Sequence, residues 1–550
     1  MVAVDTLEMA SSLHTCGAPV KRAATDASSL LDVGADPLYV LVEAMAQSGA
    51  GDDLSRLAAT CSFFGGTSRG DSLVTVAAKA TCQAAGVGRQ RRGFCWPRML
   101  SWVRDAVQVG PCHNHKTIES AVRTAMSHSR RDGALVIVSH GAYVENGIEV
   151  GSVLGLPPAK SLHIWARDEQ QRATRFLQPV IWSHTGDHLL LINSGTVSVY
   201  GIDFRAYDAG REGGVDDEDE EAEEEEEDVT VDPLSIFVSG GAALRMSHCS
   251  VCCDGGSGVN VFGGGSSCVI DHCAIVGCTL HGVKVGRGSC ANVSDSTIRH
   301  NRGDGIHAQD AGTVVAVHGC DVICGESSGV SVHAGARGFV TQCSIGSNEV
   351  SNVSVFGAET YVELCESSLC FSASTGVLVH DEACAYLQSN VIAGNGTDGV
   401  SVHFSQVILE GNLIRENKVH GVSVESGLLQ MNHNSLSANK STQCMVAGGC
   451  SKASLTGNEI LPAQRYSRCV CVAAGAEATL NANQLMHGEG MVEVHGEGSR
   501  VTLWPDDAVS GNGGIQLTGT LVEGIEGQGS RSSSDPHCRT ASCSRRLDLS

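Results

Sequence analysis

Carboxylate and cationic side chains are the first groups in this sequence that could do chemistry. The closest sets are Asp304 with Asp310 and Asp381 with Glu382, with Lys284 and Arg299 nearby. A sugar hydrolase needs two carboxylates about 5 to 9.5 Å apart, and a polysaccharide lyase needs a base such as Lys or Arg. These charges form no repeated row of acidic groups. We therefore interpret them as solvated turn residues and predict no catalytic residue.

Histidines form a second candidate set. His333, His380 and His403 each directly follow a Val-x-Val pair. Imidazoles on neighbouring repeats could share a metal ion, but Gly, Gln, Phe and Glu occupy the same place in other repeats. The sequence therefore predicts no metal and no cofactor. It predicts instead a ligand-facing strip that contacts protein or glycan, made of Phe262, His333, Phe356, His380 and His403.

Cysteine is abundant, with 24 residues, but its spacing fits neither a disulfide knot nor a zinc site. The group Cys249-x-x-Cys252-Cys253 has no second pair at a finger-like distance. No basic start followed by an apolar segment is present, and no run approaches about 18 apolar residues. We expect a cytoplasmic or nuclear protein with free buried thiols and no membrane partner.

A repeat must position these groups. A Val-x-Val pair or a close variant returns every 22 to 25 residues, often after a glycine. The first members of the pairs are Ile236, Val259, Val283, Ile306, Val330, Val353, Val377, Val400, Val422, Met445, Val470, Val492 and Ile515. Period-2 apolar residues indicate strands, and a fixed period of this length indicates a solenoid. The sequence therefore predicts a mainly β protein, a right-handed parallel β-helix with one coil per repeat.

A second register lies 10 to 12 residues before each pair and holds one polar or thiol residue. Its members are Cys249, Cys273, Ser296, Cys320, Cys343, Cys365, Asn390, Asn412, Asn434 and Asn458. Equal positions of successive coils lie about 4.8 Å apart. Stacked Asn side chains can hydrogen-bond along such a ladder, and Cys can replace them as a small buried residue. We interpret this register as part of the scaffold.

Charge restricts the partners. The formal net charge is −24, and twelve of these charges come from the run Asp216 to Asp228. The rest of the chain is still acidic, which argues against nucleic acid or an anionic membrane as a partner. The run itself is predicted to be a solvated, disordered loop between two coils, over residues 207–232.

The N-terminal region follows a helical pattern. Asp36 and Pro37 open one helix, and Asp52 and Asp53 open a second with apolar residues on one face. The stretch resembles an F-box, the helical motif that docks on the Skp-type adaptor of cullin–RING ubiquitin ligases. The matching residues, and so the predicted partner-binding face, are Pro37, Leu38, Leu41, Val42, Leu54, Leu57, Cys61 and Phe64. Asp36 replaces the usual Leu, and Phe64 stands where Trp is common. The alternative is a helical cap on the solenoid.

The start of the solenoid resembles that of pectin-lyase-like β-helices. A capped helix begins at Thr117, the strand Ala134 to Val138 follows, and Gly141 to Glu145 forms a Gly-x-Tyr-x-Glu turn. The repeats resemble the carbohydrate-binding and sugar-hydrolase (CASH) type. Both resemblances concern the fold, and a fold does not by itself define an activity.

The predicted organisation has five parts. These are a disordered start (1–30), an F-box-like helical region (31–80), a linker (81–110), the β-helix (111–522) and a disordered tail (523–550). The resemblance to F-box proteins with CASH-type repeats implies a non-catalytic, substrate-recruiting subunit of a cullin–RING (SCF-type) ligase. Its partners would be the Skp-type adaptor, the cullin core and a protein substrate. The alternatives are a carbohydrate-active or glycan-binding β-helix and a purely structural scaffold.

Overall fold

A computed structural model describes most of the region predicted to form the β-helix. It describes residues 106–128, 133–145, 147–151, 161–167, 179–183, 188–206, 236–462, 467–486 and 492–503, with short strands beyond. The disordered start, the F-box-like region 31–80 and the acidic loop 207–232 lie outside the described residues. Within the predicted tail 523–550 the structure describes β48 (Arg545–Leu549). The chain divides into two compact units, with the second holding most of the residues from Phe204 onward.

The described residues of the first unit form a parallel sheet and helix α8. Strands β1 (Val107–Val109), β2 (Gly133–Val138), β5 (Ser161–Ala166) and β8 (Thr196–Tyr200) pair in that order. Helix α8 (Ile118–His128) begins after Thr117, whose Oγ1 accepts the Ser120 N–H at 3.3 Å. The Glu145 carboxylate accepts the N–H groups of Ile118 and Glu119. The predicted capped helix is present, and Glu145 satisfies N–H groups of its first turn that have no partner within the helix. Strand β1 lies inside the span predicted as linker.

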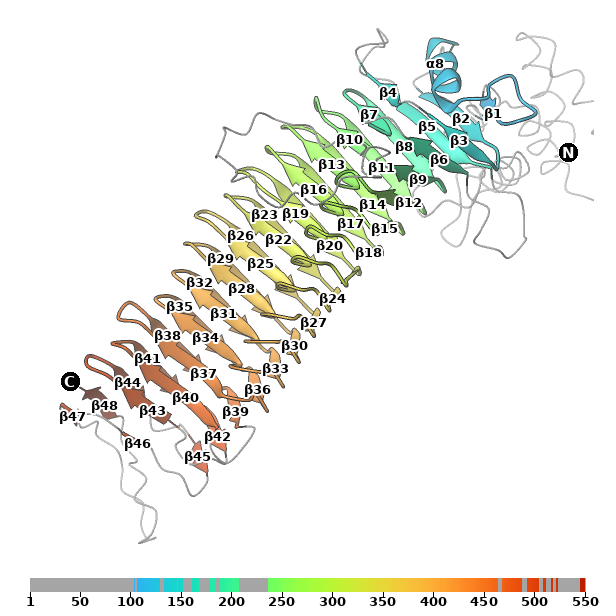
Figure 1. Ribbon diagram of the computed structural model, residues 1–550. Helices are drawn as coiled ribbons and strands as arrows, with labels where there is room; N and C mark the ends of the chain where they lie inside the picture. Colours follow the sequence, from blue (N-terminus) through green and yellow to red (C-terminus); the bar gives the residue numbers. More distant parts are fainter. Residues whose placement is uncertain are drawn as a thin grey trace, which may run out of the picture. The chain divides into compact units, whose positions relative to one another are not determined.

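The second unit is a parallel β-helix, and each coil contributes one strand to each of three sheets (Figure 1). The Val-x-Val sheet consists of β4 (Ile148–Val150), β7 (Leu190–Ile192), β10 (Ile236–Val238), β13 (Val259–Phe262), β16 (Val283–Gly286), β19 (Ile306–Ala308), β22 (Val330–His333), β25 (Val353–Phe356), β28 (Val377–His380), β31 (Val400–His403), β34 (Val422–Glu425), β37 (Thr442–Ala447), β40 (Arg468–Ala473), β43 (Val492–His495) and β46 (Gln516–Leu517). The prediction of a mainly β parallel solenoid is confirmed.

The other two sheets of this unit differ in strand length. The long-strand sheet contains β11 (Ala243–Ser247), β14 (Ser267–Asp271), β17 (Cys290–Ser294), β20 (Val314–His318), β23 (Arg337–Thr341), β26 (Tyr361–Cys365), β29 (Cys384–Gln388), β32 (Gln406–Glu410), β35 (Leu428–Asn432), β38 (Lys452–Thr456), β41 (Glu477–Asn481) and β44 (Arg500–Leu503). The short-strand sheet contains β12 (Ser250–Cys253), β15 (Ala274–Val276), β18 (Thr297–Arg299), β21 (Asp321–Ile323), β24 (Ser344–Gly346), β27 (Ser368–Cys370), β30 (Val391–Ala393), β33 (Leu413–Arg415), β36 (Ser435–Ser437), β39 (Glu459–Leu461), β42 (Gln484–Met486) and β45 (Ala508–Ser510). The remaining strands are β3 (Ala142–Val144), β6 (Val180–Ser183), β9 (Asp203–Ala206) and β47 (Leu521–Val522).

Alternation along each strand separates the core from the outer face. Val259 and Val261 are fully buried, and the corresponding residues of later coils fill the interior in the same way. Where a glycine precedes the pair, close packing requires it. A Cβ at Gly399 would lie 2.6 Å from the carbonyl oxygen of Gly421 in the next coil. Of the part of the chain that the structure describes, no helix is long and apolar enough to cross a membrane.

The polar register is a continuous ladder, with one correction to the predicted members. Ser367, not Cys365, occupies the place between Cys343 and Asn390, because its Oγ accepts Cys343 N–H at 3.1 Å and its N–H reaches Asn390 Oδ1 at 2.9 Å. The Val-x-Val register also shifts by one residue at β37, where Cys444 rather than Met445 pairs with Val422. Both errors arise because the turns vary in length. The ladder error is an offset of two residues, and the error at β37 is a one-residue slip, which exchanges inward and outward positions.

A second asparagine ladder, which was not predicted from the sequence, runs parallel to the first. Asn395 donates its Nδ2 hydrogen to Asn417 Oδ1 at 2.9 Å, and Asn417 does the same to Asn439 at 2.9 Å. The amide of Gln443 ends this ladder by accepting from Asn439 Nδ2 at 2.7 Å. Two buried amide ladders therefore hold successive coils in register.

Candidate functional site

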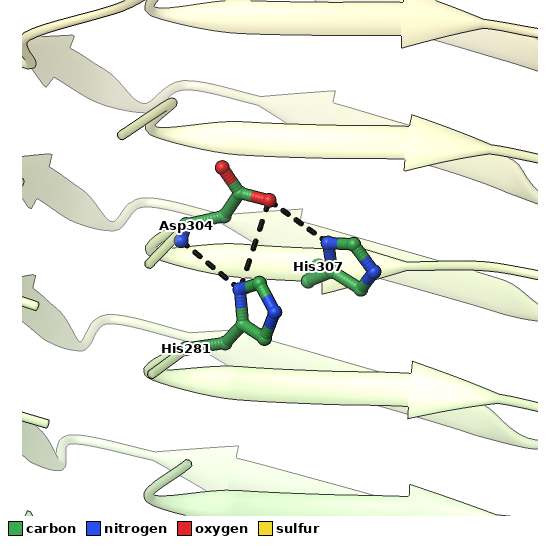
Figure 2. Close-up of side chains that lie close together, drawn as sticks. All are labelled: His281, Asp304 and His307. Carbon is green, nitrogen blue, oxygen red and sulfur yellow. Dashed lines mark hydrogen bonds and ion pairs between the residues drawn. The ribbon is translucent and has the colours of Figure 1, made fainter. Parts of the chain in front are cut away.

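The outer face of the Val-x-Val sheet carries a cluster of His281, Asp304 and His307 (Figure 2). His281 and Asp304 occupy the turns just before β16 and β19, each two residues before the first residue of its strand. His307 is the second residue of β19 and points outward between two buried residues. The three side chains are only 11 to 19% exposed. Consecutive coils thus place an acid and two imidazoles in contact.

Asp304 and His307 form a fixed pair. His307 Nδ1 lies 2.8 Å from Asp304 Oδ2. The other carboxylate oxygen, Oδ1, accepts from Ser327 Oγ at 2.8 Å and from Ser328 N–H at 3.0 Å. Burial alone would raise the pKa of Asp304, but hydrogen bonds from His307 and Ser327 and the nearby His281 lower it. Asp304 is therefore an ionised acceptor that orients the His307 ring.

The pair continues to a second imidazole. His307 Nε2 lies 2.9 Å from His333 Nε2 and 3.1 Å from Gln309 Oε1. Burial, followed by the charge of His307, lowers the pKa of His333, which favours a neutral His333 ring. Two ring nitrogens at this distance share a single proton. Asp304, His307 and His333 therefore form a hydrogen-bonded chain along which a proton can move.

His281 supports this chain from the neighbouring coil. Its Nδ1 accepts the backbone N–H of Asp304 at 3.0 Å, and its ring stacks on His307 with centroids 4.1 Å apart. Burial, followed by the charge of His307, lowers the pKa of His281 to about 3, with smaller effects of the same sign from Lys284 and His333 and an opposing one from Asp304. His281 is consequently a neutral, positioning group.

Replacing His281 with glutamine should reduce the loss of stability in acid. An unfolded histidine takes up a proton near pH 6.5, whereas folded His281 stays neutral until about pH 3. The unfolded state thus binds more protons between these values, so wild-type stability falls as the pH falls through that window, by roughly 1.4 kcal/mol per unit at most. Thermal melts at pH 4 to 7 measure this slope. The exposed His318→Gln variant is the control, and equal slopes for wild type and His281→Gln would contradict the assignment.

The cluster also meets a simple distance criterion for a metal site. His281 Nδ1, Asp304 Oδ2 and His307 Nδ1 all lie within 4.8 Å of one another. The two rings, however, are stacked with only 24° between their planes, so the lone pairs of their nitrogens run side by side instead of meeting at one point. Both nitrogens already have hydrogen-bond partners. The geometry therefore favours a proton-transfer chain over a metal centre.

The predicted ligand-facing strip is partly continuous. The rings of His333 and Phe356 stack at 4.5 Å, Phe356 and His380 stack at 4.9 Å, and His380 pairs in register with His403. Phe262 does not join them, since Gly286 and Gln309 intervene and its ring stacks on Phe237 at 5.8 Å. The strip is thus two groups of rings on one sheet face.

The carboxylate pairs weighed from sequence are not brought together as pairs. Asp304 contacts His307, while Asp310 Oδ2 accepts the backbone N–H of Arg287 at 2.9 Å in a turn. Asp381 binds His380 Nδ1 at 2.8 Å and is largely exposed. His281 and His307 were missed because neither occupies the position directly after a Val-x-Val pair. Aligning the repeats two residues before each pair would have aligned His281 with Asp304, and His307 would have been found only by including the middle residue of the pair.

Comparison with known proteins supports the fold. A family model described as "Right handed beta helix region" matches residues 234–362 and 315–460. The chain therefore contains a right-handed β-helix repeat region, as predicted. No curated protein matches the sequence significantly.

Several solved structures match the chain at low similarity. The periplasmic alginate epimerase AlgG matches with 12% identity and a TM-score of 0.35, over 72% of this chain and 85% of that one. The A-module of the Azotobacter vinelandii mannuronan C-5 epimerase AlgE6 matches with 12% identity and a TM-score of 0.36, over 72% of this chain and 94% of that one. The catalytic domain of a GH87 α-1,3-glucanase matches with 10% identity and a TM-score of 0.33, over 75% of this chain and 68% of that one. The substrates in these names are those of the matched proteins.

Proposed function

We propose that this chain is a carbohydrate-active β-helix protein, with His307 as the acid–base group and Asp304 as its positioning partner. The observation that supports this most is the 2.8 Å contact between His307 Nδ1 and Asp304 Oδ2 on the outer face of a long sheet. A base held in one orientation by a carboxylate is the arrangement that proton transfer requires. The proposal corresponds to the alternative drawn from sequence, in which the solenoid acts on or binds a glycan.

The environment of the pair favours a hydroxyl-rich polymer as substrate. Hydrogen-bonding side chains recur along this sheet face as the partly exposed His333, His380 and His403, whereas the neighbouring serines Ser331, Ser354 and Ser401 are buried. Hydrogen-bonding groups that repeat about every 4.8 Å along a sheet match a ligand that also repeats. Nucleic acid is disfavoured because the chain carries a net charge of −24.

The reaction supported by this site is proton transfer and not two-carboxylate hydrolysis. Both oxygens of Asp304 already accept hydrogen bonds, from His307 on one side and from Ser327 and Ser328 on the other. Both nitrogens of His307 also have partners, Nδ1 with Asp304 and Nε2 with His333. A proton from a substrate carbon or hydroxyl, or from a water that attacks the substrate, therefore reaches His307 through His333 and is returned to the leaving group by the same route. The negative charge of Asp304 stabilises the imidazolium that forms in between.

The proposal is tested by incubating the full chain with neutral and acidic polysaccharides in deuterated water. Proton transfer predicts deuterium in the sugar, new double bonds or shortened chains, detected by NMR, ultraviolet absorbance and reducing-end analysis. If every polysaccharide class is recovered unchanged, the catalytic proposal is wrong.

A ligase adaptor is a second proposal, favoured by the F-box-like stretch Pro37 to Phe64. We expect residues 30–80 to capture a Skp-type adaptor in a pulldown. Leu54→Asp/Leu57→Asp should abolish capture, because charges on the apolar helix face cannot be buried in the interface. Absence of capture by the wild-type segment and by the full chain would contradict the adaptor role and leave a solenoid cap as the explanation.

A further inference from the structure

Two phenylalanines adopt a backbone conformation that large side chains rarely take. Phe371 and Phe404 have φ values of 60° and 48°, yet their side chains are 67% and 63% exposed. A left-handed backbone at such a residue is strained, and an exposed ring gains little from burial. Other coils place glycine or smaller or polar residues there, such as Gly394 and Ser347 for Phe371 and Gly357 and Ala334 for Phe404. The fold therefore does not need phenylalanine there.

The two residues flank the outer face that carries His307. Phe371 follows β27 at the corner that leads into the Val-x-Val strand β28, and Phe404 directly follows β31 at the opposite end of that sheet. Strands β28 and β31 are neighbours. They lie three and four strands along from β19, or roughly 14 to 19 Å at the usual strand spacing. A polymer of a few sugar units would span that distance.

The ring of Phe371 is supported from below. A Cβ added at Gly394 would lie 2.7 Å from Cε1 and 2.8 Å from Cδ1 of this ring, so the ring rests on bare backbone of the next coil. Gly394 itself has a φ of 68°. One side of the Phe371 ring is therefore fixed by the backbone of the next coil, and most of the side chain is open to solvent. The rings of His333, Phe356 and His380 differ, because they stack and cover one another's faces.

The surroundings select the kind of ligand. Thr397 and His403 supply partly exposed hydroxyl and imidazole groups between the two rings. Each is hydrogen-bonded to a buried hydroxyl, Thr397 Oγ1 to Thr375 Oγ1 at 2.8 Å and His403 Nε2 to Ser401 Oγ at 3.0 Å. A sugar ring has apolar C–H faces that can lie on an aromatic ring and hydroxyl edges that can bind such groups. Exposed carboxylates at Asp381, Glu416 and Glu425 repel an anionic polymer. The set therefore fits an uncharged glycan.

We propose that Phe371 and Phe404 are stacking platforms for an uncharged glycan whose chain extends to His307. This inference rests on the proposed carbohydrate activity and specifies its substrate class. Asparagine is the appropriate replacement because it tolerates a positive φ. Phe371→Asn and Phe404→Asn should each weaken glycan binding about tenfold, while the melting temperature stays equal to that of wild type or rises.

The test uses the full chain and calorimetric titration with neutral hexasaccharides of β-1,4-glucose, β-1,3-glucose, β-1,4-mannose and β-1,4-xylose, and with polygalacturonate. Phe339→Asn is the matched control, since Phe339 is an exposed ring in β23 of the long-strand sheet. It should leave affinity unchanged. His307→Gln should keep affinity and lose turnover.

The outcomes separate the two proposals. Unchanged affinity in Phe371→Asn and Phe404→Asn, together with loss of turnover in His307→Gln, would overturn the platforms and leave the proposed activity standing. Tighter binding of polygalacturonate than of every neutral glycan would overturn the substrate class. A melting temperature several degrees lower in both variants would show that the rings serve folding. Absence of binding and turnover in wild type would overturn both proposals.

Discussion

His307→Gln should lower glycan turnover by a factor of about 10² to 10⁴, the range over which general acid–base groups contribute. Glutamine can still hydrogen-bond to Asp304 but cannot accept and return a proton. Folding should change little, because the His307 side chain lies on the outer face of the sheet, away from the interior. The measurement is turnover with the best substrate of the polysaccharide panel, together with its pH dependence.

Two companion variants make this result interpretable. Asp304→Asn keeps the shape but removes the negative charge that orients and stabilises the His307 ring, so it should lose activity nearly as strongly. His318→Gln removes an exposed histidine of the long-strand sheet that contacts Thr341, and it should behave as wild type. If His307→Gln turns over substrate at the wild-type rate, the proton-transfer chain is not the reacting group.

Asn412→Leu should destabilise the solenoid by about 4 kcal/mol, a large effect for one substitution. Asn412 Oδ1 accepts from the backbone and side-chain amides of Asn390 at 2.9 and 3.0 Å. Its Nδ2 donates to Leu387 O at 2.8 Å and to Asn434 Oδ1 at 2.9 Å. Leucine would leave these buried groups without partners, and each costs about 1 to 3 kcal/mol when unsatisfied.

The stability prediction is best measured by hydrogen exchange, because solenoids open coil by coil. Protection should fall most in the coils around β30 to β36. Asn292→Leu is the control, since Asn292 is exposed in β17, and its effect should stay within about 0.5 kcal/mol. Equal protection in the Asn412 and Asn292 variants would mean that the ladder does not hold the coils together.

Sequence periodicity was sufficient to predict the solenoid because each coil needs the same residue types at the same positions. Valines at alternate positions must be buried, and a glycine must allow the next coil to approach, as at Gly399. Register within the turns was less predictable. Cys365 was placed in the ladder where Ser367 belongs, and Met445 was placed inward where Cys444 belongs. A turn that gains or loses one or two residues leaves the hydrophobic period almost unchanged.

The candidate site was harder to predict because its members are far apart in sequence. His281 and Asp304 are 23 residues apart, and only the stacking of coils brings them together. Asp304 was identified as a charged candidate, but its partner was sought among carboxylates and not among histidines. The histidine column from His333 to His403 was found because its members directly follow the Val-x-Val pairs. The F-box-like residues lie outside the described part of the chain, so that prediction stays a prediction.

Regular stacking of the coils fixes the distance between sites on the solenoid by the number of repeats that separate them. The residues following His333 and Phe356, Ala334 and Gly357, are equivalent in adjacent coils, so residues 334–356 constitute one whole repeat. Excising such a repeat would leave His307 and the two exposed phenylalanines intact but bring them one strand spacing closer together, about 4.8 Å. Gain or loss of single repeats could then change which unit of a bound polymer meets the reacting histidine, without altering any residue that touches it.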